Sequence, residues 1–216
     1  DLLGSGIEFE LHSQRGAGAY ICGEETALLE SLEGKKGQPR FKPPFPAQVG
    51  AFGKPTTINN TETLASIPPI IRNGPDWFAK LGIENSGGSK VFSVSGHVNR
   101  PGNYEVPMGI PFKDLLTLAG GVQDGRALKA VIPGGSSVPV VPADAIMGCT
   151  MDYDGLSKVG SALGAGSVIV MDETTCMVEV LERISYFYFA ESCGQCTPCR
   201  EGTGWLYRIL RRVRSG

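Results

Sequence analysis

The sequence has 216 residues, of which 41% are hydrophobic and 19% charged, and its formal net charge is -2 at pH 7. This length allows one large domain or two to three small ones, each with a hydrophobic core. The composition is that of an ordinary globular protein, which argues against intrinsic disorder and against a basic nucleic-acid-binding surface. No apolar run reaches eighteen residues, so the sequence predicts no membrane-spanning helix.

Both ends of the sequence look like the interior of a longer chain. The start, Asp1-Leu2-Leu3-Gly4, lacks an initiator Met and the basic and apolar regions of a signal peptide. The end, residues 211–216, follows soon after an unfinished helical pattern. We therefore expect a fragment.

The first part of the chain predicts a strand, a turn and a helix. Apolar residues alternate with polar ones over residues 7–11, which is typical of a strand. A glycine-rich turn at 16–19 leads into a helical pattern over 24–32, which Gly34 closes. The proline-rich stretch 41–46 favours extended backbone and cannot join a central strand.

A second helix should begin near Asn59. Glu62 follows Asn59 at the spacing of a capping-box acid, and Leu64 and Ile67 give the helix an apolar side. The adjacent prolines at 68–69 should interrupt or kink it.

From residue 86 onward the pattern changes to a small α+β module. A Gly-Ser linker at 86–89 precedes short predicted strands around one helix at 111–119. The strands are expected at 90–95, near 104, near 130, near 138 and at 167–171. Helical spacing of apolar residues begins near Thr175, and a further helix is expected from Arg200 onward.

Three of the six cysteines, Cys193, Cys196 and Cys199, form a C-x2-C-x2-C run. This spacing lets one loop wrap three thiolates around a face of an iron-sulfur cubane. A secreted disulfide framework is usually a shorter and more cysteine-dense chain with a signal peptide. Zinc stays open as an alternative, and either metal site needs a fourth ligand that we cannot place in the sequence.

The remaining candidate ligands lack partners at suitable spacing. His12 and His97 are interpreted as loop or satisfied interior histidines. We interpret Cys149 and Cys176 as small core residues and Cys22 as a packing residue within the glycine-rich turn.

The glycine-rich turn before Glu24 suggests an anion site, because a helix N-terminus offers free N–H groups and a favourable dipole. Its spacing is neither G-x-G-x-x-G nor a Walker sequence. Glu24 and Glu25 would repel a phosphate but could accept hydrogen bonds from ribose hydroxyls or a nucleotide amide. The alternative is that they are simply acids at a helix start.

Four blocks of the sequence resemble a single family. Residues 16–31 and 191–202 resemble the two signatures of the NADH-binding flavoprotein (F-type) subunit of respiratory complex I. The same subunit type occurs in NAD-linked hydrogenases and formate dehydrogenases. Residues 42–46 and 54–63 also resemble this family, so the resemblance covers essentially the whole chain.

The resemblance implies a set of residues that bind FMN and NADH. Tyr20, Gly23 and Glu24 would lie beside the flavin, and Glu25 and Lys42 would face the nucleotide. The segment that borders the flavin and its phosphate side would be formed by Ile58, Asn59, Asn60 and Thr63.

Cys193, Cys196 and Cys199 match three ligands of the family's 4Fe-4S cluster, whose fourth cysteine is expected beyond this sequence. The resemblance also implies an upstream flavin loop outside it, so the fragment alone should bind FMN and NADH weakly or not at all. The implied reaction is hydride transfer from NADH to FMN, then one-electron transfer to the cluster. No side chain is expected to act as a catalytic acid or base.

The resemblance implies an α/β and α+β multidomain fold. Residues 1–85 would end a Rossmann-like FMN/NADH-binding domain, 86–173 would form a β-grasp (soluble-ligand-binding) module, and 174–216 would begin a helical 4Fe-4S domain. For the module at 86–173, a structural brace is favoured over a ligand binder.

The expected partners are other subunits of a multi-subunit redox complex, including a 2Fe-2S thioredoxin-like subunit. Nucleic acid is not expected, and membrane contact would occur only through partner subunits. The expected location is cytoplasmic or in the mitochondrial matrix, peripheral to the membrane that holds the complex. The alternatives are a diaphorase subunit of a hydrogenase or formate dehydrogenase, and a non-catalytic cluster-binding scaffold.

Overall fold

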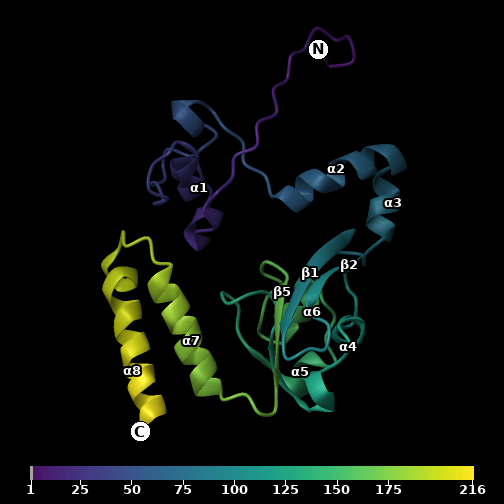
Figure 1. Ribbon diagram of the computed structural model, residues 1–216. Coiled ribbons are helices and arrows are strands. Elements are labelled where there is room, and N and C mark those ends of the chain that lie inside the picture. The colour runs from purple at the N-terminus through teal and green to yellow at the C-terminus, as the bar shows by residue number, and fades with distance from the viewer. Residues whose placement is uncertain (1) are drawn as a thin grey trace. The chain divides into compact units, whose positions relative to one another are not determined.

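A mixed five-stranded sheet organises the middle of the chain in the computed structural model, which describes residues 2–216 (Figure 1). Its order is β2-β1-β5-β3-β4, with β1 and β5 parallel and the other neighbours antiparallel. The strands are β1 (Ser89–Gly96), β2 (Gly102–Pro107), β3 (Leu128–Ile132), β4 (Val141–Pro142) and β5 (Ser167–Asp172).

The chain divides into two units, which are described separately. One unit holds the chain up to Ile58 together with Leu181–Gly216, and the other holds Asn59–Val180. The fold is therefore mixed α/β with one mixed sheet. The predicted division at 85/86 and 173/174 stays a prediction.

The sheet unit has a core because its strands alternate in polarity. In β1, Phe92 and Val94 are buried while Val91 and Ser93 are exposed. Helix α4 (Phe112–Leu118) contributes Phe112, Leu115 and Leu116 to the same core. Each fully buried side chain of this size stabilises the fold by about 1.5–3 kcal/mol relative to exposure. The unit also contains η3 (Gln123–Gly125), α5 (Ala143–Ile146) and α6 (Tyr153–Lys158).

Helix α2 (Thr61–Asn73) departs from the sequence prediction in two ways. Its N-cap is Asn60, not Asn59, because the Asn60 side chain accepts a hydrogen bond from the Glu62 N–H at 2.8 Å. The helix is also not interrupted at Pro68 and Pro69, although each lacks the N–H of a normal helical hydrogen bond. It ends at Gly74, which adopts a φ of +89°.

Helix α3 (Pro75–Lys80) packs against the segment that leads into β1. The Gly88 N–H donates to the Phe78 carbonyl at 2.9 Å, and Ser86 is buried. A Cβ at Gly88 would lie 2.1 Å from the Phe78 ring. The predicted Gly-Ser linker is therefore a packed connection, since only a residue without a side chain lets the ring approach.

The other unit is built mainly from helices. Its elements are η1 (Tyr20–Gly23), α1 (Glu25–Leu32), η2 (Ala51–Gly53), the end of α7 (Met177–Ala190), the π-helical turn η4 (Pro198–Gly202) and α8 (Thr203–Ser215). The strand predicted at 7–11 is absent: these residues are exposed and pair with no strand among the described residues. Alternating polarity is not sufficient, because a strand also needs a hydrogen-bonded neighbour.

Helices α7 and α8 lie side by side and contact through aromatic rings (Figure 1). Tyr207 lies 5.2 Å from Tyr186 and 6.5 Å from Phe189, measured between ring centroids. Gly204 is buried under the Phe189 ring. Among the described helices, none is both long and apolar enough to cross a membrane.

We predict that Gly88→Ala destabilises the sheet unit more than Gly121→Ala does. Both glycines have positive φ, +87° and +78°, but a Cβ at Gly121 meets nothing within 4 Å. Both variants should lose more than about 1 kcal/mol from the backbone conformation, and only Gly88→Ala adds the clash with Phe78. Urea unfolding measures both losses, and equal losses would contradict the packed connection.

Candidate functional site

Glu24 is fixed in place by the start of α1. Its carboxylate accepts the N–H groups of Thr26 at 2.9 Å and Ala27 at 3.0 Å, so it acts as the N-cap. Partial burial is the largest effect on the pKa of Glu24 and raises it. Hydrogen bonds from Thr26, Ala27 and Lys42 together outweigh burial and leave the pKa below its ordinary value. Glu24 is therefore an ionised, oriented acceptor.

Lys42 lies between the two acids of the glycine-rich block. Its ammonium group contacts Glu24 Oε1 at 3.2 Å and also pairs with Glu25. Hydrogen bonds to Glu25 and then to Glu24 raise the pKa of Lys42, so it stays protonated. The structure thus brings together three predicted site residues whose summed charge is -1, which weakens the argument that the acids repel a phosphate.

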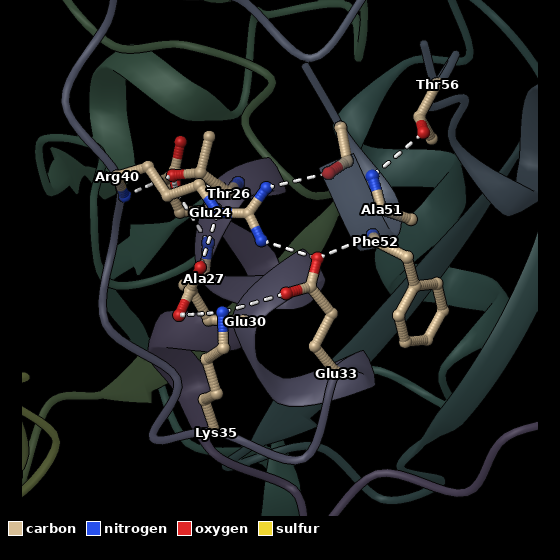
Figure 2. Close-up of polar contacts among 11 residues, drawn as sticks. Glu24, Thr26, Ala27, Glu30, Glu33, Lys35, Arg40, Ala51, Phe52 and Thr56 are labelled. Atoms are coloured by element: carbon tan, nitrogen blue, oxygen red, sulfur yellow. Dashed lines mark hydrogen bonds and ion pairs between the residues drawn. The ribbon is translucent and has the colours of Figure 1, made fainter. Parts of the chain in front are cut away.

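The loop that carries Lys42 is attached to α1 by Arg40 (Figure 2). The Arg40 N–H donates to Thr26 Oγ1 at 2.9 Å, and its guanidinium group donates to Glu33 at 2.7 Å and to the Gly50 carbonyl at 3.0 Å. It also pairs with Glu30. Arg40 therefore links α1 to the loop at several points, a geometry that a lysine could not reproduce.

Glu33 extends this network to η2. It accepts the Phe52 N–H at 2.8 Å and pairs with Lys35 at 3.0 Å (Figure 2). Hydrogen bonds from Arg40, Lys35 and Phe52 lower the pKa of Glu33 to about 2. The thiol of Cys22 packs against Gly37, where a Cβ would approach its sulfur to 2.6 Å, and this fits the packing role predicted for Cys22.

The predicted flavin-bordering residues fall at the junction of the two units. Ile58 ends the first unit and is half-buried. Asn59, Asn60 and Thr63 belong to the second unit and are exposed, with Asn60 serving as the N-cap of α2. The structure places these three together at one helix start, where an anion is favoured by the helix dipole.

The three clustered cysteines are free thiols in the loop between α7 and η4. Cys193 is half-buried, and Cys196 and Cys199 are exposed. Cys196 and Cys199 contact each other: hydrogen bonds from Cys199 lower the pKa of Cys196, and the same contact raises that of Cys199. Among the described residues no three metal-binding side chains converge at ligand geometry. The donor set suits an iron-sulfur cluster, but the loop as seen brings only two thiols together.

Arg200 organises the cysteine loop. Its guanidinium group donates to the Gly194 carbonyl at 3.0 Å, the Gln195 carbonyl at 3.4 Å and Thr197 Oγ1 at 3.3 Å. Gly194 has a φ of +74°, which favours glycine. The loop is therefore shaped by its own backbone rather than by disulfides.

A contact distant in sequence joins the glycine-rich block to the cysteine loop within one unit. The Tyr20 N–H, at the start of η1, donates to the Glu191 carboxylate at 2.9 Å. The Tyr20 ring meets Phe187 edge-on at 5.1 Å. Glu191 lies two residues before Cys193, so this contact connects the proposed nucleotide segment to the proposed cluster loop.

Sequence reasoning missed Arg40 and Glu191 as positioning residues. Arg40 stands just before the recognised block 42–46, and Glu191 opens the recognised block 191–202. Their position beside these blocks was the only signal available, because their partners are 7 to 171 residues away.

Three known families match successive parts of the chain. The Nuo51 FMN-binding domain matches residues 4–69, the SLBB domain matches 91–141, and the NADH-ubiquinone oxidoreductase-F iron-sulfur binding region matches 179–216. Together they cover the glycine-rich block, the sheet and the cysteine loop.

Curated relatives align with nearly the whole chain. The F-type subunit of NADH-quinone oxidoreductase in Rickettsia bellii (strain OSU 85-389) is 57% identical over 215 residues, covering 99% of this chain and 52% of that protein. The Rickettsia typhi protein of the same name is also 57% identical, with 51% of its length covered. The chain thus spans about half the length of the curated relatives it matches.

A solved structure supports the same assignment. The NAD+-reducing nickel-iron hydrogenase in the H2-reduced state matches with a TM-score of 0.83 and 39% identity, over 93% of this chain and 34% of that chain.

The fold and the matched regions define part of a redox flavoprotein with an iron-sulfur region. In particular, the chain belongs to the family of F-type subunits of NADH-quinone oxidoreductases and carries their FMN-binding, SLBB and iron-sulfur regions. The resemblance predicted from the four sequence blocks is confirmed.

We predict that Glu33→Gln removes an acid-sensitive part of the protein's stability. The folded pKa of Glu33, about 2, lies below the ordinary value of 4.5, so its stabilisation is complete above pH 4.5 and is lost as the pH falls toward 2. The difference in Tm between wild type and variant should therefore shrink between pH 6 and pH 3. Glu84→Gln, at an exposed acid outside the network, is the control. A constant difference for Glu33→Gln would count against the network.

Proposed function

We propose that the protein containing this chain oxidises NADH with FMN and passes the electrons to a 4Fe-4S cluster, feeding quinone reduction in a respiratory complex. The carrying observation is that the Glu24, Glu25 and Lys42 group and the cysteine loop share one compact unit, joined by the Tyr20 to Glu191 hydrogen bond. A flavin-to-cluster reaction requires these two sites to be held near each other.

Each group of residues has a separate role in this proposal. Tyr20, Gly23 and Glu24 line the flavin, while Glu25 and Lys42 orient NADH through its hydroxyl and phosphate groups. When bound, FMN accepts a hydride, meaning two electrons and one proton, and releases the electrons singly to the cluster. The chain's own residues bind, orient and tune, and none needs to accept a proton.

The start of α2 supports a role in binding the FMN phosphate. Asn59, Asn60 and Thr63 are exposed at the N-terminus of a helix of 13 residues. The positive end of the helix dipole and polar side chains both favour a phosphate group there. Ile58 would border the flavin from the preceding residue.

The cysteine loop would hold the cluster through Cys193, Cys196 and Cys199. The contact between Cys196 and Cys199 and the turn at Gly194 place two thiols on one side of the loop. A cubane of this type takes four thiolates, so a fourth ligand is needed from outside the run.

We further propose the finer architecture and context that the resemblance implies. The chain would comprise the end of a Rossmann-like domain at 1–85, a β-grasp module at 86–173 and the start of a helical cluster domain at 174–216. It would work in a multi-subunit complex beside a 2Fe-2S thioredoxin-like subunit, at the cytoplasmic or matrix face of the membrane. The hydrogenase match favours one second candidate, a diaphorase subunit of an NAD-linked hydrogenase.

We predict that Cys196→Ser in the full-length protein abolishes the cluster but keeps flavin-dependent NADH oxidation. The thiolate is lost from one of the proposed ligands, whereas the acids and lysine of the nucleotide segment are untouched. The measurements are the electron paramagnetic resonance signal of the reduced cluster and NADH-dependent ferricyanide reduction.

The control is Cys176→Ser, which changes another exposed free thiol outside the loop. It should keep both the cluster signal and the ferricyanide reduction. A wild-type protein that binds FMN but oxidises no NADH would favour a non-catalytic scaffold, and a colourless protein with one zinc would contradict the cluster.

We predict that Glu25→Gln changes the affinity for NADH or the reduction potential of the flavin. The variant leaves Lys42 with Glu24 as its only partner in the pair and makes the group more positive by one charge. Loss of a partly exposed interaction of about 1 kcal/mol corresponds to roughly a fivefold change in Kd. NADH titration and potentiometry in the assembled complex measure both quantities.

Glu8→Gln, at an exposed acid in the same unit, is the matched control. Unchanged NADH affinity together with unchanged flavin potential in Glu25→Gln would rule out the role assigned to Glu25.

A further inference from the structure

Glu62, in the first turn of α2, is bound to the first strand of the sheet. Its Oε1 accepts the Val91 N–H at 2.7 Å, and its Oε2 pairs with the Lys90 ammonium group at 2.8 Å. The side chain of Lys90 is only 17% exposed. One carboxylate of the helix start is thus held by two adjacent residues of β1.

The carboxylate takes a place where the sheet has no strand. β5 pairs with β1 only from Ser93 onward, where the Ser93 N–H donates to the Gly166 carbonyl. The Val91 N–H lies two residues earlier and therefore points to the same edge. Glu62 supplies the acceptor that β5 does not reach, so the contact satisfies a backbone donor of the sheet.

Lys90 is fitted into this corner by a glycine. A Cβ at Gly166, in the turn before β5, would approach the Lys90 side chain to 3.0 Å. Burial raises the pKa of Glu62 as the largest single effect, but the bonds from Lys90 and Val91 outweigh it and keep the carboxylate ionised. The pair is therefore a built contact rather than a chance meeting of two exposed side chains.

The same residue is also part of the helix cap. The Glu62 N–H donates to the Asn60 side chain, while its carboxylate binds β1. Glu62 is thus not the capping-box acid that the sequence predicted, because its side chain reaches forward to the sheet instead of back to the cap. Asn59, Asn60 and Thr63 are fixed relative to the sheet through this residue.

We propose that Lys90 is a positioning residue for FMN: through Glu62, the sheet module anchors the start of α2 that faces the FMN phosphate. This inference rests on the proposed function and gives the sheet module a role in cofactor binding. Lys90 also neutralises a carboxylate that would otherwise repel the phosphate. Its loss should therefore weaken binding of FMN both by releasing the helix start and by exposing a negative charge.

The test is titration of the flavin-depleted full-length protein with FMN and with riboflavin, which lacks the phosphate. Lys90→Met should weaken FMN binding roughly fivefold and change riboflavin binding less than about twofold, since the anchored segment faces the phosphate. Lys113→Met, at an exposed lysine of α4 in the same module, should match wild type. Tm is measured in parallel.

A second variant separates charge from anchoring. Glu62→Gln keeps an oxygen that can accept the Val91 N–H and removes the charge, so the double variant Lys90→Met/Glu62→Gln should recover much of the lost FMN affinity. A purely structural role would lower Tm without distinguishing FMN from riboflavin. If Lys90→Met does not fold, Glu62→Ala against Glu62→Gln gives the same comparison, with weaker FMN binding expected for Ala.

Equal FMN affinity in Lys90→Met and Lys113→Met, with wild type binding FMN, overturns this inference alone. If Lys90→Met does not fold, equal FMN affinity in Glu62→Ala and Glu62→Gln does the same. Absence of FMN binding by the wild-type full-length protein overturns the proposed function and the inference with it.

Discussion

Acidic side chains that accept backbone N–H groups are the interaction on which the arrangement of the site depends. Where an element begins or a strand lacks a neighbour, N–H donors are left without partners, and each must find an acceptor. Glu24 serves α1, Glu33 serves η2 and Glu62 serves β1. Glu191 does the same for η1 from the far side of the sequence. These carboxylates join separate segments at the points where the proposed cofactor residues lie.

A carboxylate used in this way brings negative charge close to a site that must accept phosphate groups. The chain compensates for that charge locally with basic side chains. Lys42 pairs with Glu24 and Glu25, Arg40 with Glu33, and Lys90 with Glu62. Acid and base thus work as pairs, in which the acid fixes the backbone and the base restores the electrostatic balance. This arrangement removes the conflict between the acids after the glycine-rich turn and a bound nucleotide.

Local signals in the sequence predicted the parts of the site that lie within one segment. The cysteine run, the glycine-rich block and a helix start near residue 60 all depend on spacing over a few residues. The strand at 7–11 and the interruption at Pro68 were wrong, because pairing and packing override local preference. The partners of Arg40, Lys90 and Glu191 could not be predicted, since a hydrogen bond between distant segments exists only once the fold has brought them together.

The contact between Tyr20 and Glu191 spans 171 residues of sequence yet lies within one compact unit. The sheet occupies the chain between these two segments, so the fold inserts a complete module into the sequence between the nucleotide segment and the cysteine loop. Such an insertion is tolerated when the ends of the module can return to the same place. The Tyr20 ring against Phe187 and the N–H bond to Glu191 hold that return point. Two segments that must exchange electrons can therefore stay together while the module between them anchors the neighbouring helix.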